Sequence, residues 1–388
     1  MMQRLVDIYK TVIALSLGVL PLCACSDDTE PKSPDKGTQL KLVVFPQTFR
    51  DMTPTWTRAG LPDGFVPYEE LTPHVDASRV QIRAIITGCK EEDNVYNDVI
   101  SNGIFAFHDE TVDNVRSYSW TSTIPTLQPG HYFIYGFMPA EDVGSVAIDP
   151  YDGTSFQSGA VMTIAGLDVV TPSDVCVVVG VKAHTDNTTP IGEVGISLGE
   201  FEFVSDAENT TSYAYLLLDH IFSGLSFRFS IDSDYNQRRT IKLKKIALRA
   251  IGSSTISTVT ATVKLKANSG SSPLEQVTFT ADEPVSGGSK SAAIYDSEEV
   301  ELTTTPQDFL ACLVPNMNST FELETVYNVY DKAGTLLRED QTAKNQITLP
   351  SDLMAAGSVY TMNVTVMPTY LYMLSEPDLD NPVIQIDN

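Results

Sequence analysis

Residues 22–60 read LCACSDDTEPKSPDKGTQLKLVVFPQTFRDMTPTWTRAG, and this stretch organises the rest of the chain. Its centre, Leu40–Phe45, is an apolar and partly β-branched run, which predicts a β-strand. A polar linker precedes this strand, and a loop that ends in Thr57–Gly60 follows it. One strand between two such segments predicts an element that can be exchanged with a strand from a neighbouring molecule.

Residues 1–24 predict an export signal rather than part of the fold. Arg4 and Lys10 supply positive charge, and Val12–Leu22 is an apolar run too short to span a bilayer. Residues 22–25 follow the order apolar, small, small and cysteine of a lipobox, which predicts lipidation of Cys25. Lipidation of Cys23 fits less well because Pro21 lies close before it, and cleavage nearby without lipidation is the other alternative.

Residues 25–39 predict an acidic linker between the lipid and the first strand. Asp27 and Asp28 directly after the cysteine resemble the acidic export signal of lipoproteins in some Gram-negative anaerobes. That resemblance implies the outer leaflet of the outer membrane. Two or more acyl chains on Cys25 would anchor the protein stably.

The net charge of the chain is −25, which argues against nucleic acid as a partner. Three cysteines besides Cys25 remain in the mature chain, namely Cys89, Cys176 and Cys312, and their spacing matches no metal motif. Cys176 and Cys312 lie in apolar runs, so we expect both to be small buried side chains. The sequence leaves the state of the three thiols open.

The remaining chain predicts an all-β fold with little helix. Short apolar or alternating runs recur with turn signals between them, as in two β-sandwich domains in tandem. We place the first domain at residues 40–205 and the second at residues 206–388, with an extended tail at 367–388. The segment Tyr213–Gly224 is the one place that could hold a short helix. The predicted strands after the first are Val80–Ile86, Ile104–His108, His131–Phe137, Val161–Ile164, Val175–Val181, Leu225–Ile231, Thr240–Arg249, Ser257–Leu265, Gln276–Thr280, Glu299–Leu302, Phe309–Val314, Phe321–Tyr330, Thr335–Glu339, Gln346–Leu349 and Gly357–Val366.

Candidate chemistry in the sequence is weak, and we expect neither an enzyme nor a cofactor or metal site. His220 beside Asp219 allows a catalytic interpretation, but we expect a structural histidine next to a core strand. Glu322 and Glu324 share one face of a strand, as many surface carboxylates do. The histidines form no HExxH motif, and no GxSxG or Gly-rich phosphate loop is present.

Two further segments allow a binding interpretation. Residues 376–381 are rich in acidic groups, but their spacing departs from that of an EF-hand calcium loop. Trp56, and Trp120 with Tyr118 near it, could stack on sugar rings, although packed aromatic side chains are the more common outcome. A solvated acidic tail and packed aromatics are therefore the simpler expectations.

The whole mature chain resembles the fimbrillins, the type V pilin subunits of oral and gut Gram-negative anaerobes. Four features carry the resemblance: the lipobox with its acidic linker and single strand, the site Thr57–Ala59, the segment Asp219–Phe229, and Ala356–Tyr360 before the last long strand. The resemblance implies two transthyretin-like β-sandwich domains. It also implies a subunit of cell-surface fimbriae that contributes to adhesion.

The family implies a mechanism of strand exchange. An arginine-specific protease cuts between Arg58 and Ala59, with Arg50 as the alternative site, and residues 40–58 leave. A strand from a neighbouring subunit then fills the groove, which is strand addition between chains. In the removable strand, Leu40, Leu42 and Val44 would point to one face.

The donor strand is expected at the C-terminus, where two short segments can extend. Their candidate residues are Tyr370, Tyr372, Leu374, Val383, Ile384 and Ile386. Pro368, Pro377 and Pro382 would interrupt a longer strand. The chain could therefore be a stalk, tip or anchor subunit, with other fimbrial subunits, the outer membrane and the protease as partners. The alternative function is a monomeric surface lipoprotein that keeps its first strand and binds glycan or a host protein.

Overall fold

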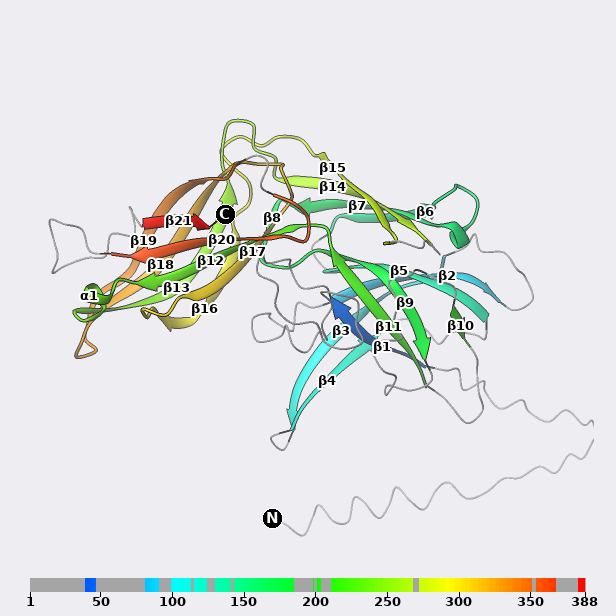
Figure 1. Cartoon of the computed structure of the whole chain (residues 1–388), viewed down its shortest axis with the longest axis horizontal. Helices are drawn as coiled ribbons and strands as arrows, with labels where there is room; N and C mark the ends of the chain where they lie inside the picture. The colour runs from blue at the N-terminus through cyan, green and yellow to red at the C-terminus, as the bar shows by residue number, and fades with distance from the viewer. Residues whose placement is uncertain are drawn as a thin grey trace, which may run out of the picture. The chain divides into compact units, whose positions relative to one another are not determined.

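The computed structural model describes most of the chain after residue 38 (Figure 1). The described residues are 39–46, 81–90, 99–112, 115–123, 130–140, 143–184, 198, 201–203, 211–267, 272–350, 354–367 and 383–387. Residues 37–388 form one compact unit, while the other unit, residues 1–36, falls outside the described ranges.

The described chain is built almost entirely from β-strands, which confirms the all-β prediction. Within the described residues, the helices are a 3-10 turn at Phe156–Ser158 and the four-residue helix α1 at Ser233–Asn236. The strands are β1 (Gln39–Pro46), β2 (Gln81–Lys90), β3 (Val99–Val112), β4 (Val115–Ser122), β5 (Gly130–Met138), β6 (Ser145–Pro150), β7 (Gly159–Asp168), β8 (Val170–Thr171), β9 (Cys176–His184), β10 (Phe201–Phe203), β11 (Thr211–His220), β12 (Ser223–Ile231), β13 (Arg239–Ala250), β14 (Thr258–Lys266), β15 (Leu274–Ala281), β16 (Ala292–Glu301), β17 (Gln307–Leu313), β18 (Thr320–Asp331), β19 (Leu336–Thr348), β20 (Val359–Val366) and β21 (Val383–Asp387). No helix among the described residues is long and apolar enough to cross a membrane.

The largest sheet has eight strands. Its order is β1-β11-β9-β5-β2-β3-β4, and β10 pairs with β5 outside this path. Every pair in this sheet is antiparallel except β1 with β11, which is parallel. Because parallel neighbours cannot be joined by a tight hairpin, the parallel pair joins parts of the chain that are distant in sequence.

Three smaller sheets complete the described structure. Their orders are β15-β14-β7-β6, β21-β20-β12-β17-β8 and β16-β13-β18-β19. Strands on opposite sides of residue 205 share sheets, since β11 pairs with β9, β14 with β7, and β17 with β8. The boundary near residue 205 stays a prediction.

Alternating side chains of the strands build the hydrophobic core. In β12, Leu225, Phe227, Phe229 and Ile231 are buried, whereas the intervening Arg228 is exposed. The same alternation recurs in β14 and β18. Period-two burial is the pattern expected of strands with one face on a core, so the sequence alternation predicted these strands well.

The hairpin of β18 and β19 confirms a predicted turn. The side chain of Asp331 accepts hydrogen bonds from the backbone N–H groups of Ala333 and Thr335, at 2.9 and 2.8 Å. Gly334 adopts φ 86°, a conformation that other residues rarely adopt. The sequence Asp331–Gly334 therefore closes the hairpin through turn chemistry that can be recognised in advance.

The prediction of a helix over Tyr213–Gly224 is wrong. This segment forms most of the strand β11 and the start of β12. Its apolar run Ala214–Leu218 is buried on both faces of a sheet rather than along one stripe of a helix. A short apolar run is compatible with either structure, and pairing with β9 and β1 decides in favour of the strand.

Candidate functional site

The first candidate site is the edge of the large sheet where β1 lies. All eight residues of β1 pair in parallel with β11, from Gln39 opposite Thr211 to Pro46 opposite Leu218. β1 is the terminal strand of the sheet, and β11 separates it from β9. The predicted isolated strand is therefore an edge strand, added to a part of the chain far away in sequence.

The strand β11 has the character of an interior strand. Ala214, Leu216, Leu217 and Leu218 have no exposed surface, and Tyr215 is 2% exposed. A strand that is apolar on both faces normally has neighbours on both sides, because its free edge would expose backbone N–H and C=O groups to pairing with other chains. β1 supplies the neighbour on one side, so its loss would leave β11 as an unprotected edge.

The predicted processing sites flank β1 but lie outside the described residues. Cys25, Arg50, Arg58 and Ala59 belong to this group. The residues Leu40, Leu42 and Val44 lie in β1, where the structure describes the backbone pairing and not the side chains. The prediction that these three point to one face, and the choice of Arg58 over Arg50, stay predictions.

The predicted donor segment near the C-terminus includes a strand. Val383, Ile384 and Ile386 lie in β21, which pairs antiparallel with β20 at the edge of the five-stranded sheet. The first half of the predicted donor, Tyr370, Tyr372 and Leu374, lies outside the described residues. In this chain β21 therefore covers the edge of its own sheet.

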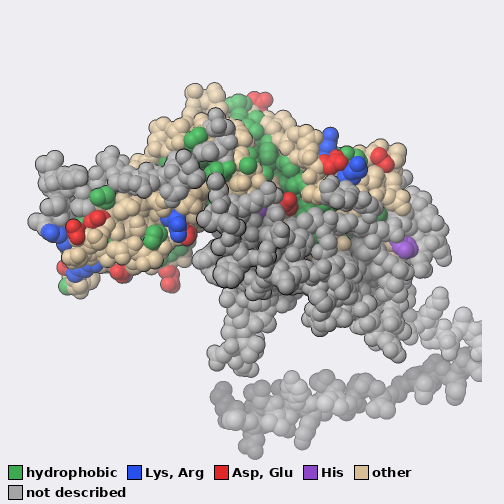
Figure 2. Space-filling view, in the orientation of Figure 1, with side chains coloured by type: hydrophobic (Ala, Val, Ile, Leu, Met, Phe, Trp, Pro, Cys, Tyr) green, Lys and Arg blue, Asp and Glu red, His purple; other side chains and the backbone are tan. Residues whose placement is uncertain are grey.

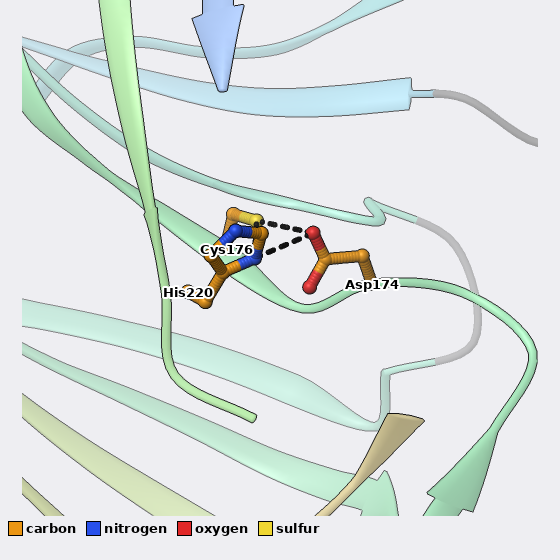
Figure 3. Close-up of side chains that lie close together, drawn as sticks. All are labelled: Asp174, Cys176 and His220. Carbon is orange, nitrogen blue, oxygen red and sulfur yellow. Dashed lines mark hydrogen bonds and ion pairs between the residues drawn. The ribbon is translucent and has the colours of Figure 1, made fainter. Parts of the chain in front are cut away.

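The second candidate site is a cluster of Asp174, Cys176 and His220 (Figure 3). Asp174 lies between β8 and β9, Cys176 begins β9, and His220 ends β11 opposite Cys176 in the pairing of the two strands. The Nδ1 atom of His220 lies 2.7 Å from Oδ2 of Asp174. The thiol of Cys176 donates to the same Oδ2 at 3.0 Å, and its Sγ lies 3.3 Å from His220 Nδ1.

Within the cluster, the ring of His220 pairs with Asp174. Successive residues of a strand point to opposite faces, so Asp219 and His220 diverge, while Asp174 comes from another segment. The 3% exposure of His220 fits the expected structural histidine, and this expectation and the catalytic alternative with Asp219 both stay predictions.

The geometry of the cluster differs from that of a Cys–His–Asp nucleophile relay. In such a relay the nucleophile and the carboxylate bind different nitrogens of the imidazole ring. Here both Cys176 and Asp174 lie at the same nitrogen, Nδ1. Burial, followed by the charge of Asp174, raises the pKa of the Cys176 thiol well above its usual value, so the thiol is not an activated nucleophile in this structure.

Replacing Asp174 tests how much this cluster stabilises the fold. In the presence of EDTA, we expect Asp174→Ala to lower the free energy of unfolding by about 1–3 kcal/mol, because it removes the acceptor shared by two buried groups. Asp168→Ala is the matched control, since Asp168 pairs with the exposed Lys290 at 3.4 Å, and we expect this variant to lose about 0.5 kcal/mol or less. Urea unfolding measures the free energy of unfolding of both variants. An equal loss in the two variants would contradict this role of Asp174.

The other predicted binding residues take part in ordinary surface or packing contacts. Glu322 forms ion pairs with Arg249 and Lys344, and Glu324 pairs with Lys344. Trp120 packs against Phe107, with ring centroids 5.1 Å apart. Figure 2 shows acidic and basic side chains interspersed on the face that it draws. Trp56 and residues 376–381 lie outside the described part of the chain.

Comparison with known proteins gave structural neighbours only. No protein-family model and no curated protein matches the sequence. A candidate cell adhesion protein from Bacteroides fragilis aligns at TM-score 0.39 and 10% identity, covering 90% of this chain and 97% of that one. A fimbrial protein from Bacteroides vulgatus aligns at TM-score 0.31 and 10% identity, covering 89% and 98%.

The fimbrial anchor protein Mfa2 from Porphyromonas gingivalis is a further neighbour. It aligns at TM-score 0.28 and 10% identity, covering 90% of this chain and 97% of that one. Since all these TM-scores lie below 0.5, we base the function on the residues and strand pairing of this chain.

Proposed function

We propose that this protein is a structural subunit of cell-surface fimbriae that assembles by exchange of its first strand. The observation that carries the proposal is the parallel pairing of the edge strand β1 with β11, whose residues 214–218 are buried. Exchange needs a strand that can leave and an edge that requires a replacement. The edge position of β1 and the buried residues of β11 support these two roles, and residues 47–80 between β1 and β2 carry the two candidate cleavage arginines.

The steps before assembly follow from the segments around β1. Lipid on Cys25 would hold the precursor at the outer membrane through the linker of residues 25–39. An arginine-specific protease would then cut after Arg58. Once this bond is broken, β1 is no longer joined covalently to β2 and the rest of the fold, so an incoming strand can displace it. No catalytic residue and no cofactor are part of this mechanism.

The mature N-terminus of the protein on its native cell surface tests this proposal. We expect an N-terminus at Ala59 in the assembled protein, identified by mass spectrometry of intact chains. A blocked and lipidated Cys25 as the sole form would favour the alternative function, a monomeric surface lipoprotein that keeps β1 and binds glycan or a host protein.

Deletion of residues 383–387 tests the role of the tail. If β21 leaves β20 to serve as the donor, its deletion should abolish polymers of the cleaved protein while each chain stays folded. Size-exclusion chromatography with light scattering measures the polymer size. Polymers of unchanged length would show that β21 is not the donor and that it only protects the edge of β20.

A matched substitution separates strand pairing from tail length. Ile384→Asp and Ile386→Asp keep the length of the tail but place charges in the strand, and we expect them to act like the deletion. Gln385→Asp leaves both isoleucines in place and should retain assembly. An equal loss of polymers with Gln385→Asp would indicate that the added charge, rather than the loss of apolar side chains, prevents assembly.

A further inference from the structure

We propose that Asp174, Cys176 and His220 form a binding site for a divalent transition metal, with Zn²⁺ as the best-fitting ion. The three residues offer a carboxylate, a thiolate and an imidazole, and their ligand atoms all lie within 4.8 Å of one another. This set of ligands suits Zn²⁺ and is poorly suited to Mg²⁺ or Ca²⁺, which prefer oxygen ligands. The inference concerns a different part of the chain from strand exchange and is independent of it.

The distances fit a tetrahedral site after a small movement of one residue. Ligands about 2.0–2.3 Å from Zn²⁺ lie roughly 3.3–3.8 Å from each other in a tetrahedron. The 3.3 Å between Cys176 Sγ and His220 Nδ1 already meets this spacing. Asp174 Oδ2 lies 2.7 and 3.0 Å from the other two atoms, so it has to move outward by roughly 0.6 Å.

Asp174 is the residue that can make this movement. It lies in the segment between β8 and β9, and its side chain is 20% exposed, whereas the side chain of His220 is 1% exposed. Cys176 and His220 are held opposite each other by the pairing of β9 and β11. Two ligands are therefore fixed by the sheet, and the third comes from a segment outside the strands (Figure 3).

One oxygen of the cluster has no partner that would compete with a metal. The Oδ1 atom of Asp174 is buried and accepts no hydrogen bond from the described residues. A buried carboxylate oxygen without a partner is costly, because it loses its hydration and gains nothing in exchange. A metal ion at the cluster would offset that cost by attracting the charge of the whole carboxylate.

Metal binding requires a defined change in protonation. Zn²⁺ binds the thiolate, so the S–H proton of Cys176 leaves to solvent. It also binds Nδ1 of a neutral His220, so any proton on Nδ1 must be lost or carried by the other ring nitrogen. The carboxylate of Asp174 binds in its ionised form. No oxidant or reductant takes part.

The site would stabilise a junction in the fold. β11 ends at His220 and β12 begins at Ser223, so the chain passes here from the eight-stranded to the five-stranded sheet. A metal bound at the cluster would tie this junction to the start of β9 and to the segment before it. β11 is also the strand on which β1 lies.

Zinc loading of the mature chain tests the site. After incubation with Zn²⁺ and dialysis, we expect one tightly bound zinc per chain by elemental analysis. At zinc about 100-fold above Kd, we expect Tm to rise by about 4 °C relative to the same protein in EDTA. Cys176→Ser and, separately, His220→Gln should abolish both effects. Wild-type protein with no retained zinc and no change in Tm would overturn the proposal.

Cys312→Ser is the matched control. Cys312 is fully buried like Cys176 but does not belong to the set of three ligands. This variant should retain the zinc and the rise in Tm, and loss of zinc would overturn the assignment to the three residues. If Cys176→Ser does not fold, Co²⁺ bound to wild-type protein provides a second test. A thiolate-to-cobalt charge-transfer band is expected, and a cobalt spectrum without thiolate bands would contradict ligation by Cys176.

Discussion

Deleting residues 39–46 is expected to destabilise the protein so strongly that most of it aggregates or unfolds. The deletion exposes the edge of β11, where Tyr215, Leu216, Leu217 and Leu218 are now at most 2% exposed. Exposing even half of these four side chains costs roughly 3–6 kcal/mol, before the loss of backbone pairing is counted. That is a large part of the about 5–15 kcal/mol that stabilises a typical folded protein.

A peptide of residues 39–46 should restore folding when supplied as a separate molecule. The soluble fraction and Tm of the deletion variant measure this rescue, and the peptide sequence QLKLVVFP is the natural strand. As a control, the same peptide with Leu42→Asp and Val44→Asp should fail to restore folding, because burying a carboxylate without a partner is costly. A deletion variant that stays soluble with an unchanged Tm would contradict the role of β1.

Blocking cleavage at Arg58 is expected to have the second large effect, a complete loss of polymers. Arg58→Ala leaves the peptide bond between β1 and the rest of the domain intact, so a displaced β1 returns as an intramolecular competitor at high effective concentration. The incoming strand of a neighbour cannot compete with it. Cells that produce the variant should carry only monomeric precursor, measured by electrophoresis without heating and by electron microscopy.

Arg50→Ala is the matched control for this prediction. Both arginines lie between β1 and β2, and both substitutions remove one positive charge. Polymers should form normally with Arg50→Ala if Arg58 is the cleavage site. The reverse result, with polymers lost only in Arg50→Ala, would place the cut at the alternative site and leave strand exchange intact.

The sequence predicted local structure far better than it predicted pairing. The alternation in Leu225–Ile231 and the turn at Asp331–Gly334 are determined by residues close together in the chain, and both predictions are confirmed. The helix predicted over Tyr213–Gly224 was wrong because its apolar run is buried by neighbours that are distant in sequence. The pairing of β1 with β11 is such a contact, and no local pattern indicates it.

The cluster of Asp174, Cys176 and His220 could not be predicted from the sequence for the same reason, namely that distant strand pairing brings its residues together. The spacing of the cysteines excluded the common metal motifs, since Cys176 has no other cysteine near it in sequence. The ligands come instead from two strand ends and the segment before one of them, brought together by the pairing of β9 and β11. Asp174 precedes Cys176 by two residues, and this short spacing is the one local signal that could have suggested the site.

The peptide composition of assembled fimbriae tests strand exchange most directly. Trypsin releases Leu42–Arg50 from any chain that retains β1, and it releases Ala267–Lys290 from every chain. Quantitative mass spectrometry gives the ratio of these two peptides in purified fimbriae and in the precursor. We predict that Leu42–Arg50 is equimolar with Ala267–Lys290 in the precursor and absent from fimbriae. Fimbriae that contain both peptides in equal amounts would contradict exchange of β1.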